Sequence, residues 1–204
     1  MFYQILKPFI ETLVKRTFKR GESIYLEGEI PESLFLLESG LVGLYHISES
    51  GKETFLRVFS KDNIFGHRSY FAEEPYHANA IALTQTEVHI ISKDQCNDIC
   101  KNHPLLLKEL TKIISRELGQ AELKIAGLFD KSATRRIIES LIYLKHKYPE
   151  KTWTRKEVAD FSASTLESVT RVMTSIDEKG LIKKIGRDFE ITDLDALLTL
   201  SSGL

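Results

Sequence analysis

The hydrophobic positions of residues 24–91 fall in short runs that glycines interrupt. The runs are rich in Leu, Phe, Val, Ile and Tyr, and the glycines between them are spaced like turns. The clearest pair of strands is 41–47 and 53–59, because Gly51 in the connecting segment can adopt the positive φ of a tight turn. This part of the chain therefore predicts an all-β unit.

From Pro104 the spacing of the apolar residues becomes helical. They recur at intervals of three and four residues, which is the heptad pattern of a coiled coil over about three heptads. We expect a long helix over residues 104–129 that joins two copies of the chain into a homodimer. The alternative is that this stripe packs on the chain's own β-unit. The predicted dimer seam consists of Leu107, Leu110, Ile114, Leu118, Ala121, Ile125 and Leu128.

The helical pattern breaks near Asp130, where we place a hinge. Asp130 and Ser132 are candidate helix caps, the segment from Thr154 to Glu157 is a capping box, and Gly180 ends a helix. The expected elements are helices over 132–146, 154–161 and 166–179, strands over 181–185 and 188–192, and a helix over 194–200. Two helices joined by a four-residue turn and followed by a two-stranded wing are the elements of a winged helix-turn-helix, which places its second helix in the DNA major groove.

The second helix of this module has one apolar and one polar face. Glu167, Thr170 and Arg171 share the polar face, where Arg can donate to guanine and Glu can accept from cytosine. Two other interpretations remain: Glu167 completes a capping box with Ser164, or it forms an i, i+4 ion pair with Arg171. The face expected to pack inward consists of Val169, Val172, Met173 and Ile176. The residues predicted to contact DNA phosphates are Arg155, Lys156, Lys183, Lys184 and Arg187.

Composition limits the other classes of protein. The chain has 204 residues and a net charge of −1, so charge alone favours no nucleic-acid partner. No apolar run of about 18 residues is present and residues 1–19 have an amphipathic helical pattern, so we expect a cytoplasmic protein without a membrane partner. Cys96 and Cys100 match no metal-ligand spacing. We expect them on a helix near the surface, with a thiol redox sensor as the alternative.

Six segments together resemble the cyclic-AMP receptor protein and fumarate-nitrate regulator (Crp/Fnr) superfamily. They are GESIYLEG (21–28), LFLLESG (34–40), GKE (51–53), FG (65–66), WTRKEVA (153–159) and LESVTR (166–171). The resemblance implies an α+β fold: a cyclic-nucleotide-binding-like β-roll sensor over 1–103, a dimerisation helix over 104–129 and a winged helix-turn-helix over 130–204. It also implies transcription regulation through RNA polymerase at near-palindromic double-stranded DNA. The segment 165–171 is more similar to the fumarate-nitrate branch, so we expect half-sites like TTGA with Glu167 and Arg171 sharing the G·C pair.

The chain departs from the family where an effector binds. Counted from Gly66, the ribose-binding Glu of the family corresponds to His67, and its phosphate-binding Arg-Ser pair corresponds to His77 and Ala78. Neither replacement reproduces a bidentate guanidinium or a carboxylate, so cyclic AMP is not expected in this degenerate pocket, which also contains Arg68. The four cysteines of an iron-sulfur sensor are absent. Three possibilities for the effector remain: an unknown small molecule, haem, or no effector at all. The two histidines could bind an anion or a metal, or act as a pH switch.

Two rival classes are weighed against a DNA-binding regulator. An enzyme of the metal-binding jelly-roll type usually needs a His-x-His pair, and neither this pair nor a nucleophile elbow or phosphate loop occurs. A cyclic-nucleotide-binding-like regulatory protein acting on a protein partner would have no use for a winged helix. We therefore expect a regulator and no catalysis.

Overall fold

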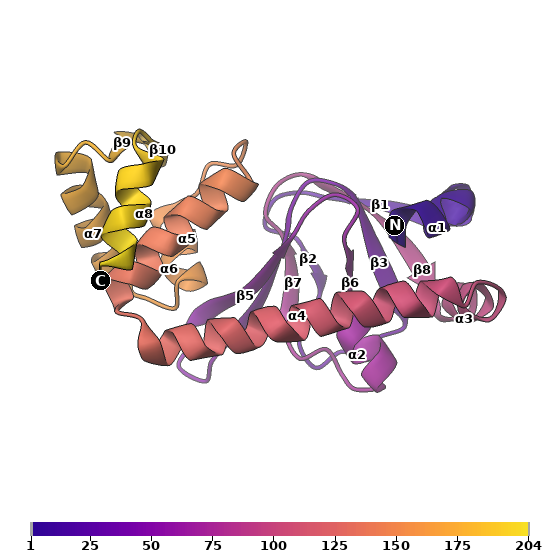
Figure 1. The fold of residues 1–204 in the computed structure, drawn as a ribbon. Coiled ribbons are helices and arrows are strands. Elements are labelled where there is room, and N and C mark those ends of the chain that lie inside the picture. Colours follow the sequence, from indigo (N-terminus) through magenta and orange to yellow (C-terminus); the bar gives the residue numbers. More distant parts are fainter. Residues whose placement is uncertain (1, 204) are drawn as a thin grey trace. The chain divides into compact units, whose positions relative to one another are not determined.

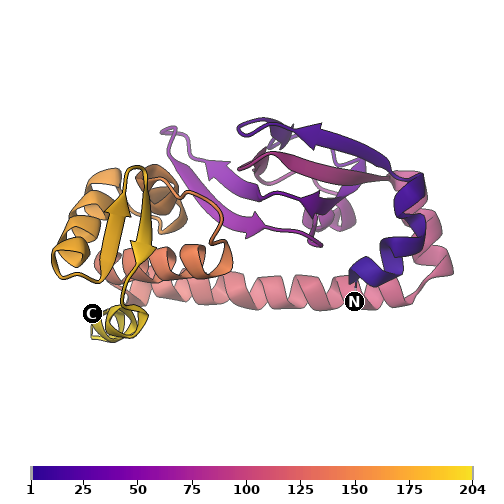
Figure 2. The ribbon, with the colours of Figure 1, turned by 90° about the horizontal axis from the view of Figure 1, so that it is seen from above.

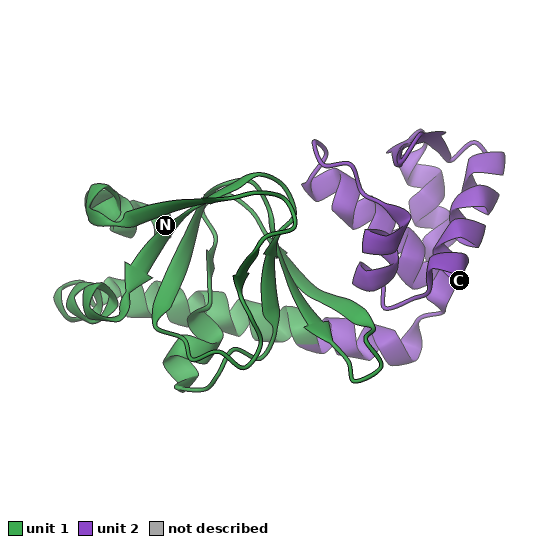
Figure 3. Cartoon of the chain, turned by 180° about the vertical axis from the view of Figure 1, so that it is seen from behind, with its two compact units in different colours: residues 1–121 green, residues 122–204 purple. Residues whose placement is uncertain are grey.

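The computed structural model describes residues 2–203 of the chain. The chain divides into two compact units, residues 1–121 and residues 122–204 (Figure 3). Unit 1 is built on two antiparallel sheets, and unit 2 on helices with a two-stranded ribbon. The α+β class predicted from the sequence is therefore confirmed. No helix within residues 2–203 combines the length and the apolar character needed to cross a lipid bilayer.

The N-terminal segment is helical over a shorter stretch than predicted. It consists of helix α1 (Phe2–Leu6), the 3-10 helix η1 (Lys7–Thr12) and strand β1 (Val14–Phe18). All five residues of β1 pair antiparallel with β8 (Thr86–Ser92), so sheet hydrogen bonds override the local helical pattern. The expectation of a helix to Lys19 is therefore wrong beyond Thr12, and Met1 lies outside the described residues.

Two four-stranded sheets form the roll of unit 1 (Figure 2). Their strand orders are β1-β8-β3-β6 and β2-β7-β4-β5. Aromatic rings pack in the core, where the ring of Tyr25 stacks on Tyr76 with centroids 3.7 Å apart and Phe35 stacks on Phe65 at 5.1 Å. The other strands of these two sheets are β2 (Ser23–Tyr25), β3 (Ser33–Ser39), β4 (Val42–Ile47), β5 (Glu53–Phe59), β6 (Ile64–Phe65) and β7 (Asn79–Ala82).

The hairpin predicted from the glycine pattern is confirmed. β4 pairs antiparallel with β5, and Gly51 in the connection has a φ of 78°. A second glycine, Gly40, has a φ of 86° at the turn between β3 and β4, and a Cβ there would lie 2.4 Å from the carbonyl oxygen of Gln85. Glycine is needed at Gly40 both for its backbone conformation and for this close approach of two chain segments.

A second core lies in unit 1 outside the roll. Helix α3 (Lys93–Asn102) begins with a capping box in which Ser92 accepts from Gln95 N–H, and helix α4 (Leu105–Asp130) follows it. The core contains Leu6, Leu13, Leu34, Leu36, Ile64, Ile91, Cys96, Ile99, Leu106 and Leu110. Cys96 is therefore buried, which corrects the expected position near the surface. α4 thus packs on its own unit through its first turns.

Unit 2 has the order of elements predicted from the caps and breaks. Its helices are α5 (Ala133–Lys147), α6 (Arg155–Phe161), α7 (Leu166–Glu178) and α8 (Leu194–Ser202), and its ribbon is β9 (Ile182–Ile185) and β10 (Asp188–Ile191) (Figure 1). Ser132 caps α5 by accepting from Arg135 N–H, whereas Asp130 is the last residue of α4. Trp153 and Phe189 are among its fully buried side chains.

Candidate nucleic-acid interface

Helix α7 has a buried face and an exposed face. Val169, Val172, Met173 and Ile176 are buried, as predicted from the sequence. This anchoring leaves Glu167, Thr170 and Arg171 exposed on the other side. The apolar face fixes the rotation of the helix, and that rotation decides which polar side chains face solvent.

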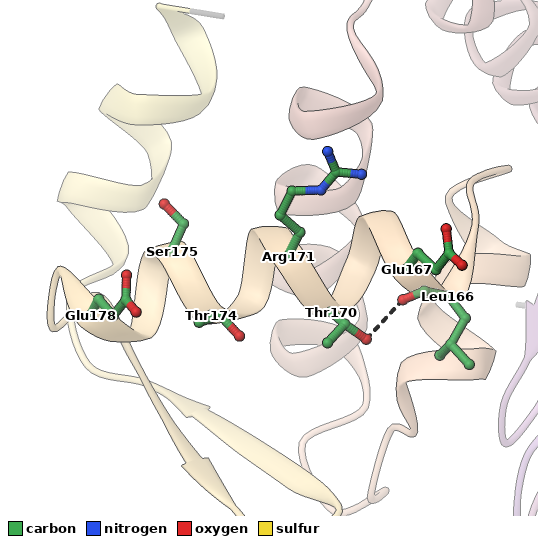
Figure 4. Close-up of a pocket in the computed structure, with 7 residues that line it drawn as sticks. All are labelled: Leu166, Glu167, Thr170, Arg171, Thr174, Ser175 and Glu178. Atoms are coloured by element: carbon green, nitrogen blue, oxygen red, sulfur yellow. Dashed lines mark hydrogen bonds between the residues drawn. The ribbon is translucent and has the colours of Figure 1, made fainter.

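The exposed side chains of α7 form two adjacent rows along an open groove (Figure 4). Glu167, Arg171 and Ser175 project from one row, and the neighbouring row carries Thr170, whose Oγ1 donates to the Leu166 carbonyl oxygen at 2.8 Å. Side chains four residues apart lie one above the other on a helix, so both rows follow from the sequence spacing. The guanidinium of Arg171 and the carboxylate of Glu167 therefore project from the same row, one helical turn apart.

Neither alternative for Glu167 fits the geometry. The N-cap of α7 is Thr165, which accepts from Ser168 N–H, so Ser164 forms no capping box with Glu167. Within residues 2–203, no ion pair joins Glu167 to Arg171, and the two charged groups stand apart in Figure 4. Both side chains thus keep their hydrogen-bonding capacity for a partner.

The turn before α7 is held by a residue that sequence reasoning missed. Arg136 on α5 donates from Nε to the carbonyl oxygen of Ser162 at 3.2 Å and from Nη2 to that of Ala163 at 3.4 Å. Its Nη1 donates to the carbonyl oxygen of Lys131 at 2.8 Å. Ala163 has a φ of 49°, which a non-glycine residue rarely adopts. Arg136 therefore ties the strained turn to α5, and no spacing rule signals a contact across 26 residues.

The predicted phosphate-binding residues fall into two groups. Arg155 at the start of α6, Lys183 on β9 and Arg187 at the tip of the ribbon are exposed. Lys156 is exposed as well, although its Nζ lies 2.9 Å from Asp160 Oδ2. Lys184 differs, because its half-buried ammonium lies 3.0 Å from the carboxylate of Asp177 on α7. Lys184 therefore braces the ribbon against α7, and its expected phosphate contact stays a prediction.

The predicted dimer seam on α4 is apolar and largely exposed. Leu107, Ile114, Leu118, Ile125 and Leu128 are exposed, with Leu118 at 59%, and Ala121 is exposed too. Leu110 is the exception at 2%, because it packs in the second core of unit 1. Leu110 is therefore not available to the predicted seam. At this position α4 packs on its own unit, as the alternative to a dimer seam predicted. Three exposed large apolar residues of α4 lie outside the predicted seam, namely Leu105, Leu123 and Phe129.

At the position of the predicted effector pocket, Glu117 of α4 contacts both His67 and Arg57. His67, the first residue of α2 (His67–Ala72), is buried, and its Nε2 lies 2.9 Å from Oε2 of Glu117. The guanidinium of Arg57 on β5 contacts the same carboxylate oxygen. Sequence reasoning named His67 but missed Glu117 and Arg57.

The other predicted pocket residues are dispersed. Gly66 has a φ of 82° and precedes α2, and Ala78 is fully buried in the roll core. Arg68 is exposed and lies 3.0 Å from Glu74. Partial burial, together with the charge of Arg68, lowers the pKa of His77. Within residues 2–203, no three His, Cys, Asp or Glu side chains are grouped so as to hold a metal ion.

Comparison with known proteins gives consistent matches over both units. Residues 15–103 match the cyclic nucleotide-binding domain family, and residues 135–200 match the Crp-like helix-turn-helix domain family. The chain is 24% identical over 192 residues to the cyclic AMP receptor protein of Thermus thermophilus, covering 93% of this chain and 89% of that protein. It is 26% identical over 205 residues to the transcriptional activator protein FnrA of Stutzerimonas stutzeri, covering 95% and 84%.

Solved structures share this fold. The structure of FixK2 from Bradyrhizobium japonicum aligns with a TM-score of 0.81 at 20% identity, over 92% of this chain and 96% of that one. The roll and the helix-turn-helix occur here in the order of the two family matches, with α4 between them. The chain therefore belongs to the Crp/Fnr family of transcription regulators, with a cyclic-nucleotide-binding-like domain followed by a Crp-like helix-turn-helix DNA-binding domain.

Proposed function

We propose that this Crp/Fnr regulator acts as a homodimer that recognises near-palindromic double-stranded DNA with TTGA-like half-sites. The observation that carries the proposal is the placement of Glu167 and Arg171, exposed and unpaired with each other on α7, one turn apart. The guanidinium of Arg171 can donate two hydrogen bonds to O6 and N7 of guanine. Glu167 can accept from the cytosine amino group of the same G·C pair.

The neighbouring row supports thymine recognition. Leu166 is exposed at the start of α7, and Thr170 lies one turn further on with its hydroxyl bound to the Leu166 carbonyl. That hydrogen bond turns the Thr170 hydroxyl toward the helix backbone. An aliphatic side chain and a threonine methyl group can both contact the thymine C5-methyl in the major groove. Such contacts fit the TT step that precedes G in the proposed half-site.

Dimerisation rests on the exposed apolar row of α4. Leu118, Ile125 and Leu128 are exposed large hydrophobic residues at heptad spacing. A second copy of α4 would cover this row, and the two-fold symmetry would present two copies of α7 to half-sites about 34–36 Å apart. Phosphate contacts from Arg155, Lys156, Lys183 and Arg187 would then fix the register.

The cell compartment and the protein partner follow from this role. A regulator of this kind acts where the DNA and RNA polymerase are, so we place it in the cytoplasm, in contact with RNA polymerase during transcription. The proposal includes no membrane partner and no catalytic step.

Binding-site selection with the full-length chain tests the proposal. The expected result is a near-palindromic consensus whose half-sites contain the G·C pair, bound by a dimer whose affinity falls steeply between low and high salt. Half-sites without that pair would refute the assignment of Glu167 and Arg171. Absence of any specific shift would instead favour a regulatory protein that acts on a protein partner.

A further inference from the structure

We propose that the carboxylate of Glu117 is a built-in ligand of unit 1, occupying the place that a small anionic effector would need between Arg57 and His67. The inference deepens the proposed function, since it addresses how the DNA-binding form is set. It starts from three side chains brought together by β5, α2 and α4.

The three side chains make a compact set of contacts. Arg57 contacts Glu117 Oε2 through Nη1, and its Nη2 donates to the Glu117 backbone carbonyl oxygen at 3.3 Å. His67 Nε2 lies 2.9 Å from the same Oε2. The Nδ1 of His67 is buried with no hydrogen-bond partner among residues 2–203, so its bond to Glu117 is the one that orients the ring. One carboxylate oxygen thus satisfies two donors on separate elements.

Burial makes this cluster more than a surface ion pair. The side chain of His67 is 3% exposed and that of Glu117 is 19% exposed. Burial alone would raise the pKa of Glu117, yet the hydrogen bond from His67 and the charges of His67 and Arg57 hold it below the ordinary carboxyl range. The carboxylate is therefore charged at neutral pH. Loss of one partner of such a buried pair leaves an uncompensated charge, which is strongly destabilising.

Other charged and titratable groups lie near this cluster, but none of those described below contacts both Arg57 and His67. The negative charge of Glu117 contributes to raising the pKa of Tyr25 on β2, after burial and the charge of Tyr76. Burial lowers the pKa of His77, which precedes β7. The charges of Arg68 and Arg57 lower this pKa further, and those of Glu27 and Glu74 raise it. Arg68 is paired with Glu74. Glu117 is thus the acidic side chain that contacts both Arg57 and His67.

A ligand of this kind has a mechanical consequence for α4. Glu117 lies in the part of α4 that belongs to unit 1, so its contacts with Arg57 and His67 fix this part of the helix on the roll. Here the chain supplies the anion itself, and an added anion has to displace Glu117 before it can bind. The DNA-binding form is then set without a cyclic nucleotide.

Amide hydrogen exchange of the full-length protein tests the tether directly. Glu117→Gln keeps the size of the side chain and removes its charge. The matched control is Glu122→Gln, which removes an exposed carboxylate from the same helix. We expect exchange of the α4 amides near residue 117 to become about tenfold faster or more in E117Q and to stay unchanged in E122Q. Equal exchange in wild type, E117Q and E122Q would overturn the proposal.

Anion rescue tests whether the site is a ligand site and not merely a brace. Glu117→Ala vacates the place of the carboxylate, and sodium formate or inorganic phosphate is added against sodium chloride of equal ionic strength. We expect formate or phosphate to raise the melting temperature of E117A and restore its slow α4 exchange, with no comparable effect on wild type. If neither anion does so while E117A remains folded, the ligand role is rejected.

A charge swap covers the case in which E117A does not fold. Glu117→Arg alone places a cation against Arg57 and His67, and Arg57→Glu in the same chain restores opposite charges. We expect the double variant to recover most of the lost α4 protection, and a double variant no better than E117R would contradict the inference. DNA affinity, with and without cyclic AMP, is a separate readout. Failure of wild type to bind DNA would refute the proposed function and leave the exchange and rescue results to decide the role of Glu117.

Discussion

The guanidinium of Arg136 lies 3.2 Å from the carbonyl oxygen of Ser162, and this hydrogen bond fixes the turn that leads into α7. The turn carries the positive φ of Ala163, and Arg136 is the side chain that donates to two of its carbonyls. A conformation of this kind persists only when the surrounding structure holds it. The orientation of α7 therefore depends on a side chain of α5.

Arg136→Ala should lower both stability and DNA affinity. We expect a loss of roughly 1–3 kcal/mol in the free energy of unfolding, because three partly buried carbonyl groups lose their donor. The measurement is chemical unfolding combined with a gel shift on the selected site. Arg135→Ala, which removes an i, i+4 pair with Glu139 on the same helix, is the control and should cost at most about 1 kcal/mol. Equal losses in the two variants would contradict the role given to Arg136.

Arg171→Ala should relax specificity at one position of each half-site. Losing a bidentate contact to guanine costs roughly 1–3 kcal/mol for the preferred base, with little change for the others. Binding-site selection on the variant measures this directly. Lys183→Ala on β9 is the comparison, since a phosphate contact should weaken binding to all sequences and reduce the salt slope by about one. A consensus in R171A as sharp as that of wild type would refute base recognition by Arg171.

Substitutions at Leu110 and Leu118 should have different effects, on stability in the first case and on dimerisation in the second. Leu110→Ala removes a buried side chain and should cost about 2–5 kcal/mol in stability while the dimer persists. Leu118→Glu places a charge on the exposed row and should yield a folded monomer with much weaker DNA binding. Analytical ultracentrifugation and thermal unfolding are measured on both variants. A dimeric L118E would contradict the seam.

Local signals explain which elements the sequence predicted well. The capping box of Thr154 and Glu157 and the apolar spacing along α7 involve residues three or four apart, so each is visible in a short window. The hairpin around Gly51 is of the same kind. Apolar periodicity likewise identified the buried face of α7. The break in the helical pattern was placed correctly, because α4 ends at Asp130 and Ser132 caps the next helix; that this break acts as a hinge stays a prediction.

Long-range packing explains what the sequence could not show. The local pattern of residues 14–18 is helical, so the sequence did not show that they form β1. What makes them a strand is the pairing with β8, which lies more than 60 residues away in the chain. The heptad pattern could not reveal that Leu110 packs inward while Leu118 stays exposed, since both satisfy the same spacing. Glu117 reaches His67 across 50 residues, and Arg136 reaches its turn across 26. Side chains of this kind are identified only once the fold brings them together.

The thiol of Cys96 should be unreactive in the folded protein. Burial, with the neighbouring Cys100, raises the pKa of Cys96 to about 12, so almost no thiolate is present at neutral pH. We expect iodoacetamide at pH 7.5 to leave Cys96 unmodified in native protein and to modify it after unfolding, as measured by mass spectrometry. Denatured protein is the internal control for accessibility. Rapid native labelling of Cys96 would revive the redox-sensor interpretation.

Asp188 should make the stability of unit 2 dependent on pH. Partial burial alone would raise its pKa, but hydrogen bonds from Lys145 and the Phe189 backbone N–H, with the charge of Lys145, hold it below the ordinary range. A carboxyl with a lowered folded pKa binds fewer protons when folded, so its contribution is complete above its ordinary value and is lost as pH falls through the lowered value.

Asp188→Asn should therefore lower the melting temperature at pH 7, and the gap to wild type should shrink as the pH falls below about 4. Thermal unfolding from pH 7 to pH 3 measures the gap. Asp195→Asn, which removes an exposed carboxylate on α8, controls for the loss of one charge. Because the Lys145 partner is nearly buried, the D188N effect should also survive moderate salt, in which exposed pairs are screened. A gap that stays constant over this pH range would show that the ion pair between Lys145 and Asp188 contributes no pH-dependent stability.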